Sequence, residues 1–92
     1  MKKKQLDFMT ALFEDSMSFL RLRQIGMENV INRLISKGIY TSMACTKNGT
    51  WSIRLDEKYS PSLYCHFHGE GVDFYSAMWE ALMGLAESKT KE

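Results

Sequence analysis

The fold is decided by residues 39–56, which read IYTSMACTKNGTWSIRLD. Before this stretch, apolar residues recur with the period of an α-helix. Within it they alternate with a period of two, which predicts β-strands at Ile39–Thr46 and Trp51–Asp56. The Lys47-Asn48-Gly49 segment between them is typical of a hairpin turn. The chain therefore changes from helix to antiparallel sheet directly after Gly38.

Two loop lengths are compatible with this hairpin, and they pair different residues. A two-residue loop sets Ile53 opposite Ala44, whereas a three-residue loop, with Gly49 as its left-handed residue, sets Ile53 opposite Met43. A slip of one residue turns every side chain to the other face of the sheet. We predict the three-residue loop because it places apolar side chains opposite each other.

Two helices are predicted before the hairpin. The first spans Leu6 to about Leu20 and has a wide apolar face, and the second spans Met27 to Lys37. Glycines suited to end each helix follow at positions 26 and 38. The N-terminal part of the chain is therefore expected to supply two amphipathic helices.

A third strand and a last helix are predicted after the hairpin. Residues 57–62 are interpreted as a connection, and Leu63–His68 alternates again, with its aromatic and imidazole residues Tyr64, His66 and His68 on the outward face. Gly69-Glu70-Gly71 then leads into a helix that Asp73 is placed to cap. The core stripe expected on this helix is Phe74, Ala77, Met78, Ala81, Leu82 and Leu85.

These elements predict a single α+β domain over residues 1–92. Their order is α-α-β-β-β-α, with a single layer of helices on one face of a three-stranded antiparallel meander, and the 92-residue length allows one hydrophobic core. Residues 1–4 and 88–92 are expected to be frayed. Without a secretory or transmembrane stretch, a cytoplasmic location is expected, with Cys45 and Cys65 as free buried thiols.

The charge balance argues against a dedicated nucleic-acid binder. The chain has 12 Lys and Arg against 11 Asp and Glu, a formal net charge of +1. Binding to phosphates normally requires a marked basic excess. Nucleic-acid binding is therefore an alternative to the favoured function, and it would use Lys2, Lys3, Lys4, Arg21, Arg23, Arg33 and Lys37.

Motifs for catalysis or for a cofactor are missing from the sequence. His66 and His68 share a strand face at a spacing that metal sites use, but no third ligand is evident. Cys65 and His66 are neighbours on a strand, so their side chains diverge and cannot act as nucleophile and base. We therefore expect no enzyme activity and no cofactor, and a metal site at His66 and His68 remains a further alternative.

The last helix carries a second apolar stripe formed by Tyr75, Trp79 and Met83, which are four residues apart. Together with the core stripe it exposes more apolar surface than a three-stranded sheet can cover. This stripe can either pack beneath the first helix or bind another protein, and a homodimer would satisfy each alternative in part. A second candidate surface is formed by Tyr64, His66 and His68 on the outer sheet face.

Residues 69–82, GEGVDFYSAMWEAL, are similar to the segment of the double-stranded RNA-binding domain that leads from a Gly-x-Gly turn into its alanine-rich last helix. The order of helix, three antiparallel strands and helix also resembles that family. Its phosphate-gripping lysines are replaced here by Asp73, Phe74 and Tyr75. The resemblance therefore implies the fold, used for protein contacts in place of RNA.

In size and style the chain also resembles the small accessory proteins of bacteriophages, which include anti-CRISPR and other anti-defence inhibitors. This resemblance implies an inhibitor that binds a host complex stoichiometrically. Combined with the missing catalytic motifs, it leads us to expect a non-enzymatic protein-binding module. The expected contact residues are Tyr75, Trp79 and Met83, with Tyr64, His66 and His68 as the second surface.

Overall fold

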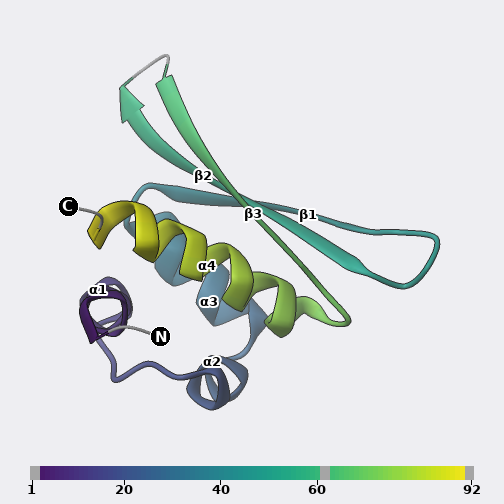
Figure 1. Cartoon of the computed structure of the whole chain (residues 1–92), viewed down its shortest axis with the longest axis horizontal. Helices are drawn as coiled ribbons and strands as arrows, with labels where there is room; N and C mark the ends of the chain where they lie inside the picture. The colour runs from purple at the N-terminus through teal and green to yellow at the C-terminus, as the bar shows by residue number, and fades with distance from the viewer. Residues whose placement is uncertain (1–2, 61–62, 91–92) are drawn as a thin grey trace.

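The computed structural model describes residues 3–60 and 63–90, with side chains at all of them except residues 59, 60, 63 and 64. Its elements are α1 (Lys3–Phe13), α2 (Phe19–Ile25), α3 (Met27–Ser36), β1 (Ile39–Cys45), β2 (Trp51–Ser60), β3 (Leu63–Gly71) and α4 (Phe74–Thr90). Figure 1 shows a twisted sheet with the helices gathered on one side of it. This arrangement confirms the predicted α+β class, in which the C-terminal helix packs on an antiparallel sheet.

The hairpin has the predicted register. Met43 lies opposite Ile53, and Cys45 lies opposite Trp51. Gly49 adopts the left-handed conformation with φ of 77°, and its N–H donates to the carbonyl of Thr46 at 3.0 Å. The sheet order is β1-β2-β3, so the hairpin strand β2 lies in the middle.

Both β2 and β3 are longer than the sequence predicted. Residues 57–60 continue β2, where we expected a connection, and β3 continues to Gly71. Glu57 pairs with Cys65 and Gly71 pairs with Trp51, so β3 follows β2 along most of its length. The alternation of apolar and polar residues stops where these extensions begin, so it could not predict them. The extended parts of β2 and β3 are strands because the two strands pair with each other there.

The long helix α4 lies directly on β3 at Gly69. A Cβ atom added to this glycine would be 2.0 Å from the carbonyl oxygen of Ala77 and 2.5 Å from the backbone nitrogen of Ala81. The missing side chain of Gly69 is therefore needed for the close approach of helix and strand. The predicted core stripe of α4 is confirmed as buried at Phe74, Ala77, Met78, Ala81, Leu82 and Leu85.

The predicted helix from Leu6 to about Leu20 is interrupted, so three helices precede the sheet in place of two. α1 ends at Phe13 and Glu14 has a φ of 55°, after which Ser18 caps α2 by accepting a hydrogen bond from the N–H of Arg21 at 3.1 Å. The left-handed backbone at Glu14 ends α1, and the side chain of Ser18 then satisfies a main-chain donor at the start of α2. The apolar pattern hides the break because Met17, inside it, is still buried.

The ends of the described chain are helical where fraying was predicted from the sequence. Lys3, Lys4 and residues 88–90 are helical, and the other residues expected to be frayed lie outside the described part.

Both cysteines are free thiols, but Cys45 is exposed where a buried thiol was predicted, and Cys65 is half-buried. Cys45 is exposed because the end of the β1–β2 hairpin projects beyond the helices (Figure 1). Among the described helices, none is both long and apolar enough to span a membrane.

Candidate binding surfaces

The apolar stripe predicted on α4 lies partly beneath α2. Tyr75, Trp79 and Met83 are all half-buried. The rings of Trp79 and Phe19 meet edge to face, with their centroids 6.1 Å apart and an interplanar angle of 77°. Tyr75 and Trp79 also pack against the core. The packing alternative therefore holds in part, because α2 covers Tyr75 and Trp79 without burying them.

Arg23 of α2 joins these aromatic rings to the start of α4. Its guanidinium carbon lies 5.0 Å from the centroid of the Tyr75 ring and 5.8 Å from that of Phe19, which are cation–π distances. Its Nη1 atom donates to Oδ2 of Asp73 at 3.1 Å. Two rings and a carboxylate therefore hold one arginine in place at the surface.

Asp73 has two roles in this arrangement. As predicted, it caps α4, since Oδ1 accepts a hydrogen bond from the backbone N–H of Ser76 at 2.8 Å. The hydrogen bond from Ser76, opposed by desolvation and aided by Arg23, lowers the pKa of Asp73 below its ordinary value. The carboxylate is therefore ionised at neutral pH and can pair with Arg23.

Apolar side chains of α2 extend this cluster to the solvent. Leu20 is 65% exposed and Phe19 is 37% exposed. The exposure of Phe19 and Leu20 was not predicted, because a continuous helix from Leu6 to Leu20 would place both residues on its buried face. Ser18 directly before the two residues is an N-cap signal that could have located the break. The α2 patch, as we name this surface, consists of Phe19, Leu20, Arg23, Tyr75 and Trp79.

The second predicted surface, on the outer sheet face, is polar. His66 and His68 are exposed as expected. Oδ1 of Asp56 lies 2.5 Å from Nδ1 of His66 and forms an ion pair with Nε of Arg54 at 3.0 Å. Tyr64 lies opposite Lys58 on β3, but its side chain lies outside the described residues.

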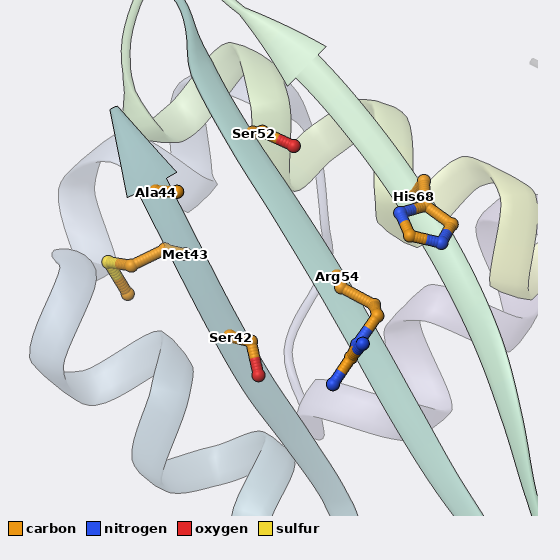
Figure 2. Close-up of a pocket in the computed structure, with 6 residues that line it drawn as sticks. All are labelled: Ser42, Met43, Ala44, Ser52, Arg54 and His68. Atoms are coloured by element: carbon orange, nitrogen blue, oxygen red, sulfur yellow. The ribbon is translucent and has the colours of Figure 1, made fainter. Parts of the chain in front are cut away.

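The charges around Asp56 keep it ionised. Desolvation acts to raise the pKa of this carboxyl, but the hydrogen bond to His66 and the charge of Arg54 outweigh it, so the pKa lies below its ordinary value. An open hollow of about 270 Å³ lies on this side of the sheet, and Figure 2 shows the residues that line it. Arg54 and His68 project over it from neighbouring strands, and it is lined by Ser42, Met43, Ala44, Ser52, Arg54 and His68.

This face offers little to a metal ion. No three His, Cys, Asp or Glu side chains come together within the part of the chain that the structure describes. His66 is directed to Asp56, while His68 lies opposite the cationic Arg54 in the sheet. A cation bound at His68 would meet the repulsion of that guanidinium.

The cations named for nucleic-acid binding lie beside carboxylates. Asp15 accepts from Arg21 at 2.7 Å and lies 3.7 Å from Arg33, and Lys37 lies 3.5 Å from Glu14. The hydrogen bond from Arg21, opposed by desolvation and aided by Arg33, lowers the pKa of Asp15. These pairs reduce the positive potential that would attract phosphates. Lys3 and Lys4 are exposed at the start of α1, and Lys2 lies outside the described residues.

Comparisons with models of protein families, with curated proteins and with solved structures found no match to this chain. They therefore add no support to the resemblance to the double-stranded RNA-binding domain or to phage accessory proteins.

Proposed function

We propose that this chain is a non-enzymatic module that binds another protein through the α2 patch. The observation that supports the proposal is an exposed leucine beside an ordered arginine and three aromatic rings. Arginine, tyrosine and tryptophan are the residues enriched at the energetic centres of protein interfaces. Leu20, at 65% exposure, adds apolar area that only a partner can bury.

The patch is organised before a partner arrives. Arg23 is held by Tyr75, Phe19 and Asp73, so little side-chain freedom is lost when a partner contacts it. Burial of a leucine side chain contributes about 1.5–3 kcal/mol. A partner with an apolar recess for Leu20 and a polar rim for Arg23 fits this surface best.

The narrower proposal is a stoichiometric inhibitor of a host complex, of the kind that phages encode and that acts in the cytoplasm. It is supported by the resemblance in size and style and by the missing catalytic motifs, and the α2 patch is the surface that such an inhibitor would use. Self-association through the same patch would give a homodimer. The contacts described above favour neither nucleic-acid binding nor a metal site.

Leu20→Glu tests the proposal, with Ala11→Glu as the matched control. Both residues are exposed on N-terminal helices, so each variant adds one carboxylate without disturbing the core. The wild-type chain is used to isolate the partner from cells that encode the chain. The affinity of the isolated partner for each variant is then measured by titration calorimetry. We expect Leu20→Glu to weaken binding by about 30-fold or more and Ala11→Glu to change it little.

The proposal is wrong if Leu20→Glu, with an unchanged circular dichroism spectrum, binds the isolated partner as tightly as the wild-type chain. It is also wrong if the isolated partner is a nucleic acid. Binding would then weaken steeply with salt and respond to the cations of α1 and α3. Light scattering of the pure chain separates a homodimer from binding to another protein.

A further inference from the structure

The outer edge of β1 presents main-chain groups that no strand of the described chain uses. Lys58 donates its N–H to the carbonyl of Gly38 at one end of the β1–β2 pair, and Thr46 donates to Thr50 at the other. Because bonded positions alternate along an antiparallel pair, the even-numbered residues of β1 face β2. The main-chain groups that point away from β2 belong to the odd-numbered residues, which after Ile39 at the start of β1 are Thr41, Met43 and Cys45.

This edge lacks the features that keep strand edges from pairing. β1 reads IYTSMAC and contains no charged residue and no proline, and it pairs with β2 without a bulge. Natural sheets usually carry such features on exposed edges because an open row of N–H and C=O groups binds other strands. The other outer strand, β3, carries Glu70 and two histidines.

Helix α3 lies next to this edge of β1. Arg33 and Lys37 turn toward the end of α1, where they contact Asp15 and Glu14. Ile35, two positions from Arg33 along the helix, therefore lies on the opposite flank and is 47% exposed. In Figure 2, α3 runs beside β1 on the side away from β2, and Met43 points toward it.

We propose that β1 accepts a fourth strand, an extended and uncharged segment of a partner protein that lies over α3. Its main chain would bond to Thr41, Met43 and Cys45, and its alternate side chains, which are apolar, would cover Ile35 and Met43. A charged segment fits this edge poorly because β1 offers no opposite charge to compensate its desolvation. This site is separate from the α2 patch, so the inference holds whether or not that patch binds.

A second copy of the chain fits this edge less well than a segment of another protein. A two-fold axis perpendicular to the sheet, which would join two β1 strands in antiparallel fashion, would bring both α3 helices to the same face of the joined sheet. Neighbouring strands lie about 4.8 Å apart, whereas packed helices require about 8–10 Å between their axes. Since α3 lies on the free side of β1, the two helices would overlap.

The test joins a probe strand to the chain. A peptide of alternating threonine and valine, as long as β1, is attached to the C-terminus through a flexible Gly/Ser linker, which raises its effective concentration to about the millimolar range. Amide hydrogen exchange is then read by NMR. We expect at least ten-fold slower exchange at Thr41, Met43 and Cys45, with smaller changes at Tyr40, Ser42 and Ala44.

Two variants make the result specific. Met43→Pro removes an N–H that points outward and leaves the bonds to β2, so this variant should stay folded and lose the protection given by the probe. A probe with glutamate in place of valine should give no protection. The inference is overturned if the probe leaves Thr41, Met43 and Cys45 unchanged, or if Met43→Pro keeps the added protection. Protection that grows with chain concentration in the absence of the probe would instead identify a second copy as the occupant.

Discussion

The two outer strands of the sheet are treated differently by the rest of the fold. α4 lies against β3 so closely that Gly69 and Gly71 have no room for a Cβ atom. β1 is contacted by α3, and from Ser42 to Cys45 it is exposed. The difference shows that α4 and β3 are packed closely against each other, whereas most of β1 is open to solvent.

The strongest way to break this comparison is Gly69→Ala. The added methyl group would meet the α4 backbone at Ala77 and Ala81, which cannot move away as a flexible side chain could. We expect a loss of about 3 kcal/mol in the free energy of unfolding, measured by urea denaturation.

Gly84→Ala is the matched control for that variant. A Cβ atom added to this glycine of α4 meets no atom within 4 Å, so alanine should stabilise the helix by about 0.5–1 kcal/mol. If both variants had the same effect on stability, the close contact between α4 and β3 would not exist.

A smaller effect is expected at Asp73, which links the core helix α4 to the α2 patch. Asp73→Ala removes both the helix cap and the ion pair with Arg23, and it should destabilise the chain by about 1 kcal/mol. Asp73→Asn can still accept the hydrogen bond from Ser76 and should cost only a few tenths of that amount. Equal losses in the two variants would show that the ion pair dominates over the cap.

The acidic groups also predict the direction of the pH dependence. Asp15, Asp56 and Asp73 all have pKa values lowered in the folded chain. Their contribution to stability is therefore complete above the unfolded pKa near 3.8 and is lost as the pH falls through the lower folded values. Thermal melts between pH 2 and about pH 6 should show this decline, and Asp73→Asn should make it shallower. A stability that rises on acidification would contradict these ion pairs.

The sequence predicted features that depend on local patterns. The register of Met43 against Ile53 and the cap at Asp73 follow from turn chemistry and apolar alternation. The helix break after Phe13 could not be predicted in this way, because the apolar period continues through Met17 although the left-handed backbone at Glu14 ends the helix. Leu20 was therefore predicted on a buried face.

Features that depend on pairing and packing in the assembled sheet could not be predicted from the sequence either. Residues 57–60 carry no apolar alternation, and β3 holds them in the sheet by pairing. Gly69 was interpreted as part of a turn, but it lies inside β3. A glycine is needed at this position because a Cβ atom would meet the backbone of α4. The free edge of β1 could be recognised only once the strand order and the position of α3 were known. Trp79 was identified from its spacing, but its contact with Phe19 depends on where α2 lies.

The most direct test of the account is residue-by-residue amide hydrogen exchange across β1 in the unmodified chain at low concentration. If the edge of β1 is open, Tyr40, Ser42 and Ala44, bonded to β2, should exchange at least ten-fold more slowly than Thr41, Met43 and Cys45. Uniform slow exchange along the whole strand would mean that something already covers the edge, and it would contradict the contrast between β1 and β3 on which the account rests.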